Sequence, residues 1–434
     1  MKGKQMRITA MLAATTAVFA CGLLAVPAQA TEGYFMPGYS APQKALAGTG
    51  IANPEDAMTL ALNPAGLVSV SEELEVGVSL FSPWRKYTAT GPGFVAPGGM
   101  TSGTVESRNN YFLVPGVAYS HPIDANSSWG IAMYGNGGMN TDYPAAANAS
   151  CPSGYSGVFC GGKTGVNLNQ MFISAGYAFK FGSLSLGVAP TFVLQMFSAN
   201  GLGLFGMYGL SSDPANLSDN GISYSYGGGI KAGAIWSVTP NLRLAVSGST
   251  PMWMTKFSKY KGLFAGGGAF DIPATVTAGV AFDATPDVTL MVDYKHIFYG
   301  GVESVSNPMT NPDFFGSDDG PGFGWHDVDV ISAGVAWKLT TEFTLRAGYA
   351  HNNNPIDADD VTINIMAPGV VTDHFSAGFS HKLTEHSTID FAALYVPEHS
   401  VSGIEVTPFG ANPNRTISLS MSQMDFTIGY RYQF

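Results

Sequence analysis

The chain has 434 residues, of which 45% are hydrophobic and only 12% are charged, with a formal net charge of −11. This negative charge argues against a nucleic-acid partner. After residue 30, no apolar run is long enough for a membrane-spanning helix. Instead, 54 glycines and apolar residues spread in alternation are typical of strands that face lipid.

The N-terminus predicts an export signal rather than part of the fold. A basic start precedes a largely apolar stretch (residues 8–26) and the A-x-A cleavage site Ala28-Gln29-Ala30. Cys21 leaves a lipoprotein signal open as an alternative, although the residues before it form a poor lipobox. We therefore expect residues 1–30 to be a cleaved signal peptide.

Residues 31–71 do not alternate and are rich in Gly, Ala, Pro and Asn. They predict a compact segment, with short helical stretches at 42–47 and 54–60. Asn63-Pro64 can form a fixed turn, because proline restricts φ and asparagine tolerates turn geometry. A large barrel is too wide for its own side chains to fill, so this segment can pack inside as a plug. A flexible periplasmic tail is the alternative.

From residue 72 to 434, long alternating runs are separated by turn-rich stretches. Short connections such as 182–183 alternate with long ones such as 303–326, which is typical of outer-membrane barrels with long loops outside. We predict an all-β fold, a transmembrane antiparallel β-barrel of about fourteen strands. The predicted strands are residues 73–90, 104–120, 128–142, 167–181, 184–199, 221–237, 242–260, 272–284, 287–302, 327–339, 342–354, 371–383, 387–402 and 417–434.

The last predicted strand shows the alternation most clearly. Phe426, Ile428 and Tyr430 share one parity, whereas polar residues such as Asp425 share the other. An apolar outer face and a polar inner face suit a barrel in lipid with a wet lumen. The strand closes on Phe434, as expected of a barrel that is presented to the insertion machinery. We therefore expect the bacterial outer membrane, with its lipids as surroundings.

The third predicted strand is interrupted by Gly135, Asn136, Gly137 and Gly138. Glycines in a strand weaken its pairing and permit a bulge or an inward kink. From these residues alone, a gap in the barrel wall and a plain bend at the barrel rim are both open.

Two long connections are unusually apolar for loops outside a barrel. Exposed apolar patches usually contact something apolar, so the connections predict a ligand-capture surface. The alternative is that these side chains pack on each other and close the barrel mouth. The residues are Leu202, Leu204, Phe205, Met207 and Leu210 in the first connection, and Leu263 and Phe264 in the second.

Cys151 and Cys160 remain after signal cleavage. Their short separation and an oxidising compartment predict a disulfide within one loop. The C-x8-C spacing lacks a nearby histidine and gives little support for a metal site. The eight histidines form no catalytic motif, so we expect neither an enzyme nor a cofactor.

Strand parity also identifies cations that face the lumen. Lys231, Lys295 and Arg346 have the parity opposite to the lipid-facing residues around them. A carboxylate in a dry pocket needs a cation or donors, so these three are candidates for binding a ligand head group. The alternative for each is a salt bridge inside the lumen, for example between Lys295 and Asp390.

The N-terminal segment contains Ala47-Gly48, then Asp56-Ala57 and then Asn63–Leu67. In order and spacing, these residues resemble the hatch pattern of the FadL family of outer-membrane transporters. Farther along, Leu345–Ala350 resembles a family segment that precedes a proline, here Pro355. One departure is His374, where many members have arginine, which weakens the case for a lumen cation there.

The resemblance implies a hatch at residues 31–71 that includes Asn63, Pro64, Ala65 and Gly66, followed by a barrel at 72–434. It also implies an inward kink of the third strand as a lateral exit and a capture groove at the two apolar loops. The expected function is passive uptake of hydrophobic small molecules, long-chain fatty acids first, by a monomer. Monoaromatic hydrocarbons are the alternative within the family, and a structural or adhesive barrel or a general porin are alternatives outside it.

Overall fold

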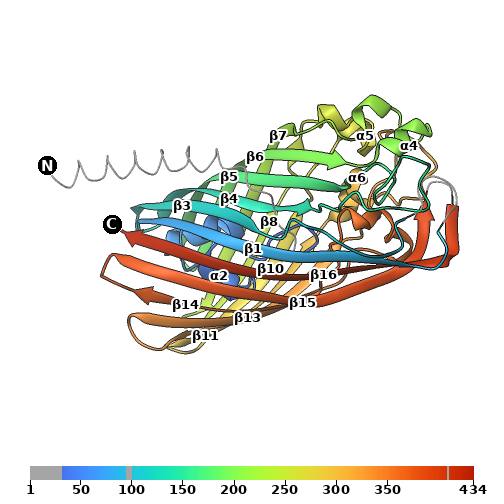
Figure 1. The fold of residues 1–434 in the computed structure, drawn as a ribbon. Coiled ribbons are helices and arrows are strands. Elements are labelled where there is room, and N and C mark those ends of the chain that lie inside the picture. The colour runs from blue at the N-terminus through green and yellow to red at the C-terminus, as the bar shows by residue number, and fades with distance from the viewer. Residues whose placement is uncertain (1–31, 94–99, 408–409) are drawn as a thin grey trace.

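A computed structural model describes residues 32–93, 100–407 and 410–434, in which one closed antiparallel sheet surrounds a lumen (Figure 1). The expected signal peptide lies outside these residues. Within them, fourteen long strands form the wall, and β1 closes the ring by pairing with β16. The wall strands are β1 (Glu73–Thr90), β3 (Phe112–Asp124), β4 (Ser127–Asn140), β5 (Gly165–Phe181), β6 (Leu184–Asn200), β7 (Ser223–Thr239), β8 (Leu242–Ser249), β10 (Thr275–Thr285), β11 (Val288–Ile297), β12 (Val328–Lys338), β13 (Phe343–Asn352), β14 (Asp373–Lys382), β15 (Ser387–Thr407) and β16 (Gly410–Gln433).

The predicted fold class is confirmed, but several strand boundaries differ. The second predicted strand is divided into β2 (Gly103–Glu106) and β3, because the turn residues Asn109-Asn110 interrupt it. The strand predicted at 242–260 ends at Ser249, since Pro251 cannot donate to a ladder, and only the two-residue β9 (Trp253–Met254) follows. In contrast, β15 and β16 extend into the predicted connection 403–416, where the ladder continues with Glu405 opposite Asn412 and Val406 opposite Ala411.

The predicted parity of the wall is also confirmed. On β11, Leu290, Val292 and Tyr294 are 44–54% exposed on the outer surface, whereas Asp293 between them is 3% exposed. The outer surface is therefore apolar and the lumen face polar, as a barrel in lipid requires. No helix in the described ranges is long and apolar enough to cross a membrane.

The N-terminal segment, residues 32–71, lies inside the ring of strands (Figure 1). Its α2 (Ala41–Ala45) contacts β13 to β16, and its η1 (Pro64–Ser69) contacts β3 to β7. Between them, α3 (Thr59–Leu62) contacts β4 and β5. The segment therefore spans the lumen between two separate arcs of the wall.

Inward charges hold this segment in place. Lys44 Nζ lies 2.6 Å from Asp425 Oδ2 on β16, and Asp293 Oδ2 accepts a 2.6 Å hydrogen bond from the Gly50 amide. Asn63 is the N-cap residue before η1, and its Oδ1 accepts from the Ala65 amide at 3.1 Å, so the predicted Asn63-Pro64 turn is a capped helix start. Gly66 is needed there, since a β-carbon would lie 2.4 Å from Thr59 Oγ1.

The expectation of an exposed apolar loop surface is wrong for most of its residues. Of the seven side chains, only Met207 is strongly exposed (68%), and Leu210 is half-buried. The reason is aromatic packing among the connections: the ring centroids of Phe264 and Phe197 lie 4.7 Å apart, and those of Phe205 and Phe159 lie 5.6 Å apart. The buried members are Leu202, Leu204, Phe205, Leu263 and Phe264.

Short helices lie in the long connections on this side of the barrel. Cys151 and Cys160 form a disulfide within the connection between β4 and β5. The helices are α4 (Gly203–Met207), η2 (Pro214–Asn216), η3 (Ser258–Tyr260), α5 (Ala265–Gly268), η4 (Tyr299–Gly301), α6 (Glu303–Ser306), η5 (Ala358–Asp360) and η6 (Ile363–Ile365).

Candidate functional site

The ladder between β3 and β4 stops partway along the barrel wall. These strands pair from Asp124 and Ser127 as far as Gly116 and Tyr134, and their ladder goes no further. Beyond that point, residues 112–115 of β3 still pair with β1, and residues 135–140 of β4 still pair with β5. The register on β5 shifts between Gly135 and Gly137, which is the bulge that the glycines permit. We call the unpaired stretch between 112–115 and 135–140 the window.

The free edge of β4 at the window is paired by the N-terminal segment instead of β3. Phe35 forms an antiparallel bridge with Gly137. The Gly138 amide donates to the Tyr34 carbonyl at 3.0 Å, and the Met36 amide donates to the Asn136 carbonyl at 3.0 Å. Residues 34–36 therefore act as a short replacement strand that covers the window from the lumen.

Both ends of the window are closed by contacts. The lower end is the one toward the short turn between β3 and β4, where the last ladder pair is Gly116 with Tyr134. At the opposite, upper end, the Arg108 amide donates to the Asp142 carbonyl at 3.0 Å, and the Asp142 amide donates to Ser107 Oγ at 2.9 Å. The side chain of Val114 lies across the opening, because a β-carbon on Gly135 would come within 2.8 Å of its Cγ1.

An anchor on β11 and η4 fixes the replacement strand. Lys295 Nζ lies 2.7 Å from Glu32 Oε2, and Tyr299 Oη donates to the Glu32 carbonyl at 2.8 Å while it accepts from the Tyr34 amide at 2.9 Å. Burial raises the pKa of the Glu32 carboxyl, and Lys295 opposes that shift. The Tyr34 ring packs edge-on against Tyr299, with centroids 5.1 Å apart.

A small cavity of about 40 Å³ lies beside Lys231 in the lumen, next to the window. Lys231 Nζ donates to the carbonyl oxygen of Ala61 and lies 5.9 Å from the centroid of the Tyr39 ring. In the described part of the chain, no carboxylate lies within 4 Å of Lys231. The residues that line this cavity include Phe35, Asn136, Phe172, Met252, Ile272 and Lys295.

The other two candidate cations form ion pairs with carboxylates of the N-terminal segment. Lys295 pairs with Glu32, and Arg346 pairs with Glu55 and also donates to Ser380 Oγ at 2.7 Å. The suggested pair of Lys295 with Asp390 is wrong, since Asp390 binds Arg431 on the neighbouring strand. A sequence pattern identifies the inward face of a strand but not the partner across the lumen.

The parity rule would also have identified Arg85, an inward cation on β1 that the sequence analysis passed over. It shares the parity of the buried residues Phe81 and Tyr87. Residues 34–36 carry no comparable signal, because a three-residue strand is too short to show alternation. Across the described residues, no cluster of three or more metal-ligating side chains is found.

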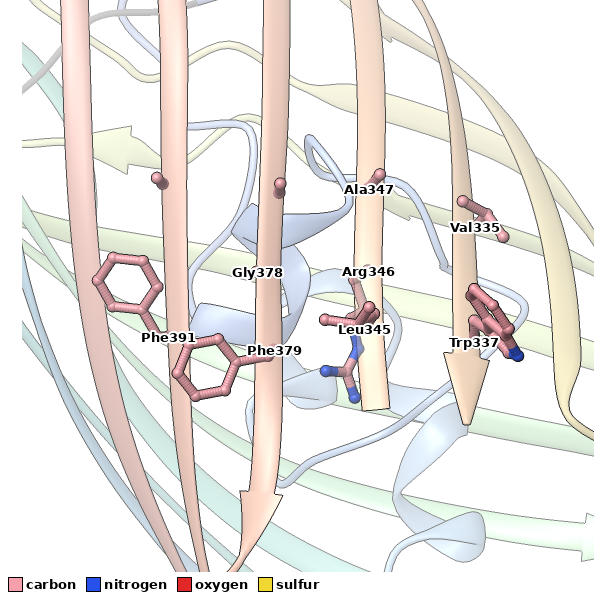
Figure 2. Close-up of a pocket in the computed structure, with 10 residues that line it drawn as sticks. Val335, Trp337, Leu345, Arg346, Ala347, Gly378, Phe379 and Phe391 are labelled. Atoms are coloured by element: carbon pink, nitrogen blue, oxygen red, sulfur yellow. The ribbon is translucent and has the colours of Figure 1, made fainter. Parts of the chain in front are cut away.

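A second depression, of about 510 Å³, lies on the outer surface over β12 to β15. Figure 2 shows Trp337, Phe379 and Phe391 on the outside of these strands, whereas Arg346 extends from the same wall toward the N-terminal segment. The depression faces lipid rather than the lumen, so it is not part of the window.

These features define a β-barrel of the outer-membrane type with a segment of the chain inside its lumen. The profile of a family described as "Outer membrane protein transport protein (OMPP1/FadL/TodX)" matches residues 22–434, so the chain belongs to this family of transporters for hydrophobic compounds. The resemblance noted in the sequence is thereby confirmed. A search of curated proteins finds no match.

Solved structures show the same fold at low sequence identity. The toluene transporter TodX of Pseudomonas putida is 18% identical with a TM-score of 0.69, covering 92% of this chain and 99% of its own. A FadL homologue of Pseudomonas aeruginosa is 15% identical with a TM-score of 0.69, covering 93% and 100%. The toluene transporter TbuX of Ralstonia pickettii is 17% identical with a TM-score of 0.63, covering 92% and 99%.

Proposed function

We propose that this protein takes up long-chain fatty acids passively and releases them sideways through the window into the outer membrane. The observation that carries the proposal is the replacement strand, because residues 34–36 occupy the edge of β4 that β3 leaves. Moving three residues opens the window without breaking the ladder of any wall strand. Sideways release suits a hydrophobic ligand, which gains little by entering periplasmic water.

The N-terminal segment is the plug in this proposal. It spans the lumen, and its charged side chains are matched to inward charges on the wall, as in Lys44 with Asp425. The ligand would first meet the exposed Met207 and Tyr208 at the outer loops and then reach the cavity beside Lys231. A fatty-acid carboxylate would be the acidic partner that Lys231 does not have within the described chain.

A reversible crosslink across the window tests the lateral route. Cysteines at Val114 and Gly135 would face each other, since a β-carbon on Gly135 lies 2.8 Å from Val114 Cγ1. Oxidation should join β3 to β4, and uptake of radiolabelled oleate by cells should fall to the level of cells without the channel. Reductant should restore uptake.

Two controls accompany this experiment. The wild-type protein treated with the same reductant controls for loss of the native Cys151–Cys160 disulfide. Each single cysteine variant controls for the side-chain changes alone. Wild-type uptake by a fully crosslinked protein would exclude the window as the route, and the ligand would have to pass the plug into the periplasm.

Monoaromatic hydrocarbons are the second candidate ligands, since TodX and TbuX are described as toluene transporters. A neutral ligand needs no lumen cation. Replacing Lys231 with Met should therefore reduce oleate uptake about tenfold, the effect of one charge-assisted hydrogen bond, and leave toluene uptake unchanged. Lys231 suits this test better than Lys295 or Arg346, which form ion pairs with the N-terminal segment, whereas Lys231 contacts it through the neutral Ala61 carbonyl. Uptake of toluene but not oleate by the wild type would favour the second candidate.

A further inference from the structure

Arg85 on β1 is a buried cation without an acidic partner. Arg85 is 4% exposed, and within the described ranges no carboxylate lies within 4 Å of its guanidinium. The guanidinium donates to the carbonyl oxygens of Asn140 and Asn109 and, at 3.0 Å, to Asn110 Oδ1. Its Nε has no hydrogen-bond partner.

These contacts place Arg85 at the upper end of the window. Asn140 is the last residue of β4, whereas Asn109 and Asn110 lie just before β3. The guanidinium also lies 5.7 Å from the ring centroid of Phe112, the first residue of β3. Arg85, on β1, therefore links β4 to the start of β3, the two strands that separate at the window.

Among the described residues, Arg85 shares with Lys231 the lack of a carboxylate partner, whereas other cations that face the lumen have one. Lys44, Lys295 and Arg431 each lie 2.6–2.7 Å from a carboxylate oxygen. A buried guanidinium held only by neutral oxygens keeps much of its desolvation cost, which an anion would offset. Asp142 at the same rim does not fill this role directly, because it lies 3.1 Å from Lys163 and 3.8 Å from Arg108.

An anion can reach Arg85 by displacing the surface connection between β2 and β3. Residues 107–111 form this connection; Asn109 is exposed, and Tyr111 is 70% exposed. The space beside Arg85 is only about 20 Å³, enough for one water molecule, so a head group must replace the Asn109 and Asn110 oxygens. The remaining lining is largely apolar and suits the first carbons of an alkyl chain. It includes Phe81, Pro83, Met139, Trp325 and Met421.

We propose that Arg85 binds the anionic head group of an amphiphile at the upper end of the window, so that the channel passes carboxylates in preference to neutral compounds with the same tail. This site rests on the proposed lateral release and adds a selectivity element to it. A planar carboxylate accepts two parallel, charge-assisted hydrogen bonds from a guanidinium. Two separate neutral amide oxygens accept weaker bonds without this geometry. The carboxylate would stay at the rim while the alkyl chain enters the lipid.

The test compares oleate with oleyl alcohol, which has the same tail and no charge. Uptake of each is measured in cells that produce the wild type, Arg85→Met, Arg85→Lys or Lys86→Met. Lys86 is the matched control, because it is the next residue on β1, points outward and pairs with Glu398 at 2.9 Å. Heat-modifiable migration in gels shows that each variant is folded.

We expect Arg85→Met to lower oleate uptake about tenfold and to leave oleyl alcohol uptake unchanged, with Arg85→Lys between it and the wild type. Lys86→Met should match the wild type for both compounds. An equal loss of both compounds in Arg85→Met would overturn the proposal, since Arg85 would then only hold the rim together. Unchanged uptake of both would overturn it as well.

Binding to purified protein separates this site from the proposed route. Oleate binding should weaken in Arg85→Met even when the Val114–Gly135 crosslink is oxidised, because the head group binds outside the crosslinked pair. If crosslinked protein still transports oleate, the lateral route fails, while loss of oleate binding in Arg85→Met would still support the site. If oleate binds equally to wild type and Arg85→Met, the site fails whatever the route.

Discussion

The carbonyl oxygen of Tyr34 lies only 1.7 Å from the position that a β-carbon on Gly137 would occupy. The N-terminal segment can approach β4 at this point only because Gly137 has no side chain. The same contact includes the 3.0 Å hydrogen bond from the Gly138 amide to Tyr34. Closure of the window therefore depends on a specific residue in the wall as well as on the segment that covers it.

Replacing Gly137 with Val should displace residues 34–36 from β4 and leave the barrel folded, since the ladder to β5 remains. The expected result is a several-fold rise in conductance for small ions across planar bilayers. Protease protection of the segment near Phe35 should fall in parallel. Wild-type conductance in a folded Gly137→Val barrel would show that the replacement strand does not seal the window.

Replacing Gly135 with Val should have a different effect, although the sequence suggests one role for both glycines. Its β-carbon would lie 2.8 Å from Val114 Cγ1, inside the window, so the added methyl groups would fill the opening. We expect oleate uptake to fall sharply without a rise in ion conductance. An increase in conductance would mean that the added side chain forces the strands apart instead.

The contrast between these glycines shows what the sequence could predict. Alternation predicted the wall strands, and the run from Gly135 to Gly138 predicted a break in one of them. What lies against each glycine depends on residues far away in the chain, such as Tyr34 and Val114. The same holds for Arg85: parity places it inward, but its partner Asn140 comes from β4 and its partner Asn109 from the connection before β3.

The apolar loops show a second limit of sequence reasoning. A run such as Leu202 to Leu210 is equally suited to an exposed capture surface and to a packed lid. The choice depends on whether other connections supply partners, and here Phe159 and Phe315 pack against Phe205. No local pattern in the sequence contains that information.

The anchor of the replacement strand can be tested at Lys295. Changing Lys295 to Met leaves the buried Glu32 carboxylate without its partner, which typically costs about 3–5 kcal/mol. We expect the N-terminal residues to leave the lumen more often and ion conductance to rise. Adding Glu32→Gln should reverse most of the rise, because the double variant buries no unpaired charge. A double variant that leaks as much as Lys295→Met would rule out this ion pair as the anchor.

The pH dependence of the closed state follows from Glu32, the partner of Lys295. Burial raises the pKa of Glu32 above its ordinary value of 4.5, so the closed state binds a proton more readily than a solvated Glu32 does. Protonation therefore favours the closed state as pH falls, and this contribution is lost as pH rises through the raised pKa. Conductance should be lower at pH 5 than at pH 8, and Glu32→Gln should flatten the difference. A higher conductance at pH 5 would contradict this assignment.

The orientation of the barrel can be tested with trypsin on intact cells. Lys259 and Lys261 are exposed in the long connection after β8, whereas Lys180 and Lys338 are exposed beside short turns. If the long connections face outside, cleavage should be confined to these connections, for example after Lys259 or Lys261, as mapped by mass spectrometry. Cleavage after Lys180 or Lys338 in intact cells would invert the orientation.

Deleting residues 32–62 should convert the channel into an open pore. The wall strands keep their ladders without the segment, so the purified variant should retain its β-sheet content and heat-modifiable migration. The charges that now hold the segment, such as Asp425 and Arg346, would become exposed to water in the lumen, where hydration replaces their present partners. Single-channel recordings should show a large, steady conductance that the wild type lacks. A folded deletion variant with no added conductance would mean that other parts of the chain close the lumen, and the segment would then not be the plug.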